Sequence, residues 1–514
     1  MQKEKDQLKI GIILNYLNMG VGSLIPIFYT PIMLQLLGQS EYGLYKLASS
    51  VTSYLGLISM GLGSAVGRYL IKAQMEGGKD DEEKTLGLFM VIFQIIALVA
   101  FVVGVVITLN LGIWYGNSLS GTELTKMKII VFILVCNTAL GFQISPYISV
   151  VNTHERYLFM QIMNIISTCV TPILNLIVLF LGFASIGMAV SSLVLNLISR
   201  SIYIFYIRKC LKIKPQYKGM PTKLLKEILA FSFWIFVANI VGQLYNSTDT
   251  IMIGAIPKLG TTGVAVYNVG ATFSSLVLTL TVGISSLLTP KTNKLVFSGA
   301  SNTELTDLAI RVGRIQGYIV TLIVAGFIAF GRPFIQFYAG KEYADAYWIA
   351  VLMMVHSMIP LVQSVCLNII VAQNKHKFRS LTYLGIAIVN VIGTWFLMQT
   401  SLGIIGAALM TCIAGVVGTW FVMNWYYDKV IHLEMVRFWK NVGKLYVIPT
   451  ILCAITLIIS KWVNFYSVPI MCLGIIIFTI LYCILSWKFV MNDYEKDLML
   501  GSILRIIKRK HEIE

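Results

Sequence analysis

Polar side chains recur at helical spacing inside the most apolar stretches of this 514-residue chain. The stretch 229–255 carries Asn239, Gln243, Asn246 and Asp249, and residues three or four positions apart share one face of a helix. Side chains in such a stripe can line a wet cavity within the bundle. Alternatively, they can hold neighbouring helices together.

Similar stripes occur in three other apolar stretches, two of them near the start of the chain. The sets are Asn268, Thr272, Ser275 and Thr279; Asn15, Asn18 and Gly22; and Ser49, Thr52 or Ser53, and Ser59. Because the stripes recur in both halves of the chain, we favour a cavity over helix packing alone. We therefore predict that five amides contact a substrate: Asn18, Asn239, Gln243, Asn246 and Asn268.

Two ionisable residues inside apolar stretches are candidates for ion coupling. Asp249 lies near the end of its stretch, where a carboxylate can alternatively cap a helix or pair with a base. His356 lies near the middle of 345–372, and a histidine there can relay a proton near neutral pH. The alternative for His356 is a neutral ring that is hydrogen-bonded between helices.

Five cationic residues at the ends of apolar stretches can bind an anionic substrate such as a phosphate. Arg311 and Arg314 are spaced three apart and so share a helix face. The other three candidates are Lys46, Arg68 and Arg200. The alternative is that these long side chains reach along the helix to the membrane surface and keep their charges in water.

The composition is that of a membrane protein. Hydrophobic residues make up 57% of the chain and charged residues 12%, with a mean hydropathy of +0.79, whereas a soluble domain carries about 25% charged residues. A helix crosses the hydrocarbon core with roughly 20 apolar residues. We predict an all-α membrane protein with fourteen such helices, at 11–37, 44–70, 86–110, 129–151, 157–181, 185–207, 229–255, 262–288, 309–331, 345–372, 380–399, 402–426, 445–464 and 467–489.

The distribution of basic residues predicts the orientation, because loops on the cytoplasmic side carry an excess of Lys and Arg. With both termini in the cytoplasm, only seven of the 40 basic residues fall on the outer side: Lys46, Lys126, Lys128, Lys258, Arg332, Lys341 and Lys461. The net charge of +17 is therefore explained by topology and by attraction to anionic membrane lipids, rather than by nucleic-acid binding.

A weak internal repeat predicts two pseudo-symmetric lobes. Residues 42–45 (YGLY) and 262–265 (TGVA) share a Gly at the same place, 220 residues apart, and Gly63 and Gly283 keep the same offset. We expect a six-helix lobe over 1–210 and a second over 211–430, with the substrate path between them. The segment 431–514 would add two helices and a cytoplasmic tail whose residues 500–510 can form an interfacial helix.

Motifs for several kinds of chemistry are missing from the sequence. It has no GxxxxGK[ST], HExxH or GxSxG motif, and its eight cysteines form no CxxC pair. The predicted connections between spans are too short for an ATPase domain. We therefore expect a transporter without metal or cofactor, and not an enzyme.

Several segments, in order and spacing, resemble the oligosaccharide-repeat-unit flippases of the polysaccharide transporter family, within the multidrug/oligosaccharidyl-lipid/polysaccharide exporter superfamily. They are 37–45 (LGQSEYGLY), 60–65 with Arg68, 247–254 (STDTIMIG) with 263–267, and 372–377 with 402–408 (LGIIGAA). The resemblance implies fourteen helices and a cleft between two lobes in a multi-pass protein of the bacterial inner or plasma membrane.

The resemblance also implies a function, namely the outward flipping of polyprenyl-(pyro)phosphate-linked oligosaccharide for surface polysaccharide. Membrane lipids, a polysaccharide polymerase and glycosyltransferases would be its partners. Lipid II flippases of the same superfamily carry arginines in spans 1, 2 and 8, and predicted spans 1 and 8 have none here, which argues against a strict lipid II role. The rival functions are a multidrug/cation antiporter of the same fold and, behind it, a membrane enzyme of polysaccharide assembly.

Overall fold

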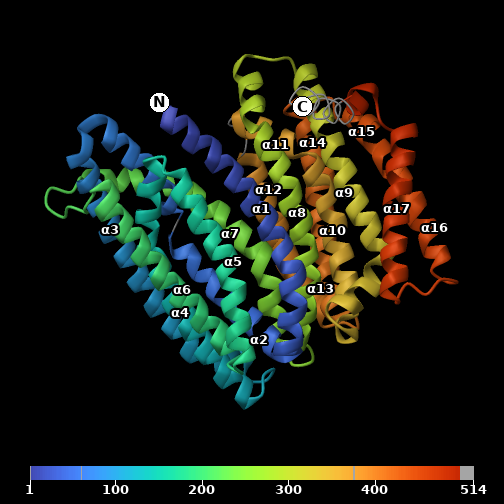
Figure 1. Cartoon of the computed structure of the whole chain (residues 1–514), viewed down its shortest axis with the longest axis horizontal. Coiled ribbons are helices and arrows are strands. Elements are labelled where there is room, and N and C mark those ends of the chain that lie inside the picture. Colours follow the sequence, from blue (N-terminus) through green and yellow to red (C-terminus); the bar gives the residue numbers. More distant parts are fainter. Residues whose placement is uncertain (1, 60, 374, 376, 498–514) are drawn as a thin grey trace, which may run out of the picture. The chain divides into compact units, whose positions relative to one another are not determined.

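The computed structural model describes residues 2–59, 61–373, 375 and 377–497, and every regular element in these ranges is helical (Figure 1). Hydrocarbon offers the backbone no hydrogen-bond partner, so a helix that satisfies its own backbone groups is the stable local structure. The predicted interfacial helix at 500–510 lies outside the described residues.

Ten described helical runs are long and apolar enough to cross a membrane, and the number is up to twelve if each of two bent helix pairs counts as one span. The predicted number of fourteen stays a prediction. One of the ten runs, Gln39–Tyr115, contains two predicted spans, 44–70 and 86–110. Gly78 separates them with a φ of 68° inside the helix, a backbone conformation that glycine adopts without strain.

The chain divides into two compact units, one of residues 1–268 with 383–407 and the other of residues 269–382 with 408–514. These bounds differ from the predicted lobes 1–210 and 211–430, which stay a prediction. Helices α8 (Gly260–Phe297), α12 (Lys377–Met398) and α13 (Gly403–Gly415) each contribute residues to both units.

Unit 1 is a bundle in which α3 packs along α4, α1 along α5, and α4 along α6. Its buried core includes Leu62, Phe89, Phe93 and Tyr147. The helices are α1 (Gln2–Leu37), α2 (Gln39–Ser53), α3 (Leu62–Tyr115), α4 (Gly121–Thr153), α5 (Tyr157–Phe180), α6 (Ala184–Tyr206) and α7 (Leu225–Ala255).

Gly43 of α2 makes a close approach to the start of α8 possible. A Cβ atom at Gly43 would lie 1.8 Å from the backbone oxygen of Thr261, so no other residue fits without moving the backbone. This contact explains why a glycine follows Tyr42 in the segment 37–45.

Unit 2 is organised around α9 (Asn302–Tyr338), beside which α16 (Val447–Ile459) and α17 (Val468–Phe489) lie in Figure 1. Phe330 of α9 forms edge-to-face ring pairs with Phe465 and Phe478 at centroid distances of 5.1 and 5.9 Å. The remaining helices are α10 (Ala346–Val362), α11 (Ser364–Ala372), α14 (Met423–Lys429) and α15 (Met435–Val442).

A buried ion pair ties α9 to the segment after α17. The guanidinium of Arg314 donates to both carboxylate oxygens of Glu495, and each of these residues is only 5% exposed. The guanidinium of Arg314 also donates to the backbone oxygens of Asn441 and Val490 at 2.7 and 2.8 Å and to the hydroxyl of Tyr318 at 2.9 Å. Arg314 is therefore a structural residue of unit 2.

The pair also fixes the charge state of the acid. Burial raises the pKa of the Glu495 carboxyl, but hydrogen bonds from Arg314, Tyr318 and the Asn492 backbone outweigh it, so the pKa lies below its ordinary value. A carboxyl whose pKa is lowered on folding adds stability that is complete above the unfolded-state pKa and is lost as the pH falls through the folded-state value.

We expect Glu495→Gln to destabilise unit 2 strongly, because it leaves the charge of Arg314 buried without a counter-ion. Breaking one side of a buried ion pair costs about 3–5 kcal/mol. Thermal unfolding of the purified protein in detergent measures the effect, and at pH 7 the variant should unfold at a clearly lower temperature. The difference in unfolding temperature between wild type and Glu495→Gln should narrow as the pH falls below 4.5, the ordinary pKa of the carboxyl.

The matched control is Asp307→Asn, which removes an exposed ion pair with Arg437 in the same unit, where the N···O distance is 2.6 Å and both side chains are more than 40% exposed. Exposed pairs contribute about 0–1 kcal/mol, so this variant should unfold close to the wild-type temperature. An equal loss in both variants, or a gap for Glu495→Gln that persists in strong acid, would contradict our assignment.

Candidate functional site

In unit 1, the helical run Gln39–Tyr115, which is long and apolar enough to cross a membrane, is interrupted after α2. Helix α2 ends at Ser53 and continues as a tight 3₁₀ segment, Tyr54–Ser59; Gly61 then has a φ of 70° before α3 begins. Within a membrane, such a break persists only where protein encloses it or where it lines a watery cavity.

Two adjoining hollows of about 270 and 360 Å³ flank the break, and we call them together the unit 1 cavity. They share Asn137 and Thr138 of α4 in their walls. The other lining residues are Ser49, Thr52, Ser53, Gly56 and Leu134 for the smaller hollow, and Ser59, Gly63, Phe93, Gly141, Phe142, Ser145 and Asn196 for the larger. None of these side chains is ionisable in the physiological range.

Helix α4 presents its polar groups to the cavity at regular spacing. Asn137, Gly141 and Ser145 follow one another every four residues, so they share one face. The amide of Asn196 on α6 donates to Oδ1 of Asn137 at 2.9 Å, which fixes the orientation of that amide. The wall therefore offers hydroxyl and amide groups that can both donate and accept hydrogen bonds.

The polar face of α7 packs directly against the break. Gln243 donates to Ser53 and, at 2.8 Å, to Ser247. One turn further on, the hydroxyls of Tyr54 and Thr248 lie 2.5 Å apart. The structure therefore places the predicted residue Gln243 beside the cavity, where it joins α7 to the end of α2.

Two other predicted residues occupy a buried polar cluster between α7 and the start of α8. Tyr267 donates a hydrogen bond to Asp249, whose side chain is 2% exposed. Asn268 donates to the hydroxyl of Thr250 at 3.3 Å and to the backbone oxygen of Val264 at 2.9 Å. Neither Asp249 nor Asn268 lines the unit 1 cavity.

The remaining predicted amides have different surroundings. Asn18 on α1 accepts a hydrogen bond of 3.0 Å from Thr168 on α5, which is a contact between packed helices. Asn239 is exposed. The side chain of Asn246 lies outside the described residues.

The predicted cations and His356 do not gather at one place within either unit. In unit 1, Lys46 lies 5.5 Å from the ring centre of Tyr42, Arg68 is exposed, and Arg200 is partly exposed. In unit 2, the exposed Arg311 lies 4.7 Å from the ring centre of Tyr494.

Two predicted site residues of unit 2 have surroundings that explain them without a ligand. Arg314 was expected to share a phosphate with Arg311, but the Glu495 carboxylate, two backbone oxygens and Tyr318 occupy its donors. His356 is buried, with Nδ1 at 2.8 Å from the backbone oxygen of Met353 and with Gly415 packed against its ring.

The sequence interpretation missed the residues on α4 and α6 that line the cavity, namely Asn137, Thr138, Ser145 and Asn196. The sequence did contain a signal for Asn137 and Ser145, because they form a stripe of small and polar residues at helical spacing together with Gly141. Asn196 shares its face of α6 with Ser192 and Arg200, four residues to either side, but only the fold brings it next to Asn137.

Known proteins share both sequence features and fold with this chain. Residues 8–294, more than half of the chain, match the family model described as polysaccharide biosynthesis protein. No curated protein matches the sequence closely enough to count as a relative.

Solved structures of transporters have the same fold. The lipid II flippase MurJ in an inward closed conformation is 15% identical over 94% of this chain and 100% of its own, with a TM-score of 0.69. An inward-facing multidrug resistance MATE family transporter of the MOP superfamily is 14% identical over 83% of this chain and 94% of its own (TM-score 0.63). The Vibrio cholerae MATE transporter VcmN in the bent form is 14% identical over 88% and 99% (TM-score 0.53).

Identities this low establish the fold alone, whereas the family match rests on the sequence. The chain therefore belongs to the polysaccharide biosynthesis protein family and is a multi-pass membrane protein with a MATE-like fold.

Proposed function

We propose that this protein is a flippase that moves polyprenyl-(pyro)phosphate-linked oligosaccharide repeat units from the cytoplasmic to the outer leaflet of a bacterial plasma membrane. The observation that carries the proposal is the unit 1 cavity, which is walled by hydroxyls and amides and flanks a broken membrane helix in a polysaccharide biosynthesis protein.

The physical need for such a cavity follows from the substrate. The hydrocarbon core is about 30 Å thick, and a polar group that enters it without a hydrogen-bond partner costs roughly 2–7 kcal/mol. A saccharide has many hydroxyls, so its desolvation is prohibitive unless the protein replaces the lost water. Groups such as Asn137 and Asn196 can replace it, because an amide offers both donors and acceptors.

The phosphate of the substrate needs cationic partners. We propose Lys46, Arg68, Arg200 and Arg311 for this role and leave Arg314 out, because Glu495 neutralises it. The amides Asn18, Asn239, Gln243, Asn246 and Asn268 remain candidate contacts for the saccharide; among them, Gln243 lies nearest to the lining residue Ser53.

The uncharged wall of the cavity separates this proposal from a multidrug/cation antiporter, whose cationic cargo would be held best by a carboxylate in the binding cavity. The buried carboxylate of unit 1 that comes closest to this requirement is Asp249, which accepts a hydrogen bond from Tyr267 and does not line the cavity. The short connections of the chain disfavour a membrane enzyme of polysaccharide assembly.

We expect Asn137→Leu and Asn196→Leu to impair flipping. Each removes hydrogen-bonding groups from the cavity wall, and a net loss of about 0.5–1.5 kcal/mol per hydrogen bond corresponds to roughly 2- to 10-fold in rate. A gene deletion in the native host should trap lipid-linked oligosaccharide on the cytoplasmic face, and the return of surface polysaccharide on complementation measures each variant. The double variant should restore less than either single variant.

Asn110→Leu is the matched control. Its amide donates to the backbone oxygen of Val106 on its own helix and does not line the cavity, so this variant should complement like wild type at equal protein level. Full complementation by the double cavity variant would contradict the proposal. Normal polysaccharide in the deletion strain, together with new sensitivity to cationic dyes, would favour the antiporter.

We further expect the membrane potential to drive transport. Moving two negative charges outward across 100 mV, inside negative, is favoured by roughly 4–5 kcal/mol. In proteoliposomes, collapse of the potential with a potassium ionophore should slow flipping of the charged substrate, and an imposed proton or sodium gradient should leave the rate unchanged. If the rate instead follows an ion gradient and loses this dependence in Asp249→Asn or His356→Gln, then that residue couples transport to the ion.

A further inference from the structure

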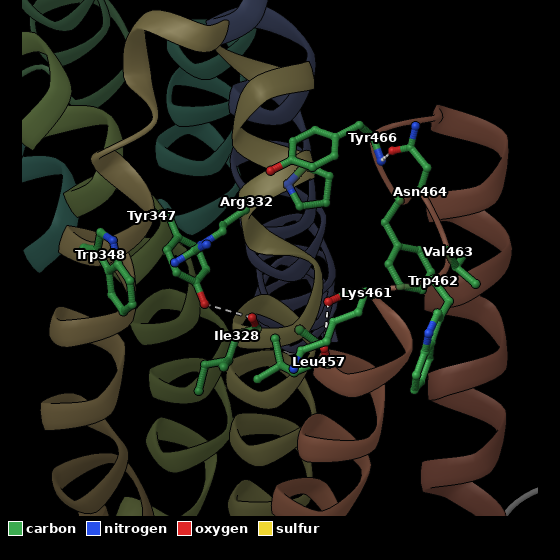
Figure 2. A pocket seen from close by; sticks show the side chains of 14 residues that line it. Ile328, Arg332, Tyr347, Trp348, Leu457, Lys461, Trp462, Val463, Asn464 and Tyr466 are labelled. Atoms are coloured by element: carbon green, nitrogen blue, oxygen red, sulfur yellow. Dashed lines mark hydrogen bonds between the residues drawn. The ribbon is translucent and has the colours of Figure 1, made fainter.

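A pocket of about 570 Å³ opens in unit 2 between the last turns of α9, the start of α10 and the loop that joins α16 to α17 (Figure 2). We call it the Arg332 pocket. Its lining residues are Ile328, Ala329, Arg332, Pro333, Tyr347, Trp348, Leu457, Ser460, Lys461, Trp462, Val463, Asn464, Phe465 and Tyr466. All of them belong to unit 2.

Arg332 is held in the pocket by aromatic rings. Its guanidinium carbon lies 5.2 Å from the ring centre of Tyr347 and 5.1 Å from that of Trp348, and Figure 2 shows it beside both side chains. Tyr347 is itself fixed, because it is 5% exposed and its hydroxyl donates to the backbone oxygen of Ile328 at 2.9 Å. These cation–π contacts place the guanidinium beside two rings whose planes are inclined by 68° to each other. A guanidinium presents its N–H donors as a planar fork that suits a bidentate anion.

Lys461 supplies a second positive charge to the same pocket, and no lining residue is acidic. Both cations are exposed. Two cations that line one pocket without a carboxylate create a positive electrostatic potential, which attracts an anion. The planar fork of Arg332 matches the geometry of phosphate oxygens, and Lys461 adds a flexible charge.

The surroundings of the pocket are those of a membrane surface. Trp348, Trp462 and Tyr466 are 43%, 78% and 57% exposed at its rim, and exposed Trp and Tyr concentrate where hydrocarbon meets water. The helices that lead away from the rim carry exposed aliphatic side chains, such as Ile455 and Ile458 on α16 and Leu473 on α17. A lipid fits both features, because its phosphate can lie in the cationic pocket while its alkyl chains lie along the aliphatic side chains of α16 and α17.

We propose that the Arg332 pocket binds the phosphate of a lipid headgroup at the predicted outer surface of the membrane. The chemistry it recognises is an anionic phosphate ester that carries long alkyl chains. An anionic phospholipid and a polyprenyl-phosphate-linked saccharide share this chemistry. The inference rests on unit 2 alone, so it stands or falls independently of the proposed flippase activity.

The test is lipid binding to the purified full-length protein, measured by native mass spectrometry in detergent. The probes are phosphatidylglycerol, phosphatidylcholine, undecaprenyl phosphate and inorganic phosphate. We expect wild type to retain phosphatidylglycerol or undecaprenyl phosphate more tightly than phosphatidylcholine. Arg332→Gln/Lys461→Gln should weaken that binding at least about tenfold, since each hydrogen bond to a charged group contributes that much.

Lys258→Gln/Lys341→Gln is the matched control, because it removes two predicted outer-side charges that do not line the pocket. It should bind as wild type does. Arg332→Lys keeps the charge but loses the planar fork, so its affinity should be intermediate, and an unchanged unfolding temperature will show that each variant is folded.

The relative affinities identify the source of the phosphate. Tighter binding of phosphatidylglycerol assigns the pocket to a structural lipid, and tighter binding of undecaprenyl phosphate assigns it to the substrate class. Equal binding by wild type and the double variant, equal losses in the control variant, or no preference over phosphatidylcholine and inorganic phosphate would overturn the proposal.

Discussion

Backbone hydrogen bonding in hydrocarbon is the constraint on which this structure depends. A backbone N–H or C=O that faces lipid without a partner costs several kcal/mol, which accounts for helices throughout the described ranges. The same constraint makes the break at Tyr54–Ser59 informative. The break packs against α3, α4 and α7 and lines the unit 1 cavity, and these are the surroundings that an irregular turn needs in hydrocarbon.

The cost of desolvation explains where charged side chains lie in this molecule and which of them are paired. The Arg314 charge is buried, and five hydrogen bonds compensate it, two of them to the Glu495 carboxylate. The Arg332 and Lys461 charges are exposed to solvent, and two aromatic rings contact the Arg332 guanidinium; no acidic residue lines their pocket in the described part of the chain. The unit 1 cavity carries no charge. Isolated cations in a wall are therefore sites where an external anion can bind, whereas a buried paired cation is part of the architecture.

The apolar blocks of the sequence predicted most helices, because their length and composition depend on the membrane rather than on packing. Helical spacing on α7 drew attention to Gln243, which donates to Ser53 at the end of α2; its contact with a substrate stays a prediction. Arg314 shows the limit of such reasoning. Its partner Glu495 is 181 residues away, and periodicity says nothing about so distant a contact. Asn196 is the converse case, since it becomes part of a site only when α6 packs against α4.

A neutral cavity suits a carrier for a physical reason. Each neutral hydrogen bond to a saccharide yields a net of only about 0.5–1.5 kcal/mol, because it replaces one to water. Several such bonds offset the desolvation of the saccharide without creating a deep energy well, and the cationic residues proposed for the phosphate do not line this cavity. A hydroxyl such as that of Ser145 can rotate to suit its partner, so it can bond differently arranged hydroxyls of a ligand. For the proposed saccharide cargo, we therefore expect the transport rate to depend more on the number of hydroxyls that reach the wall than on the identity of the sugar.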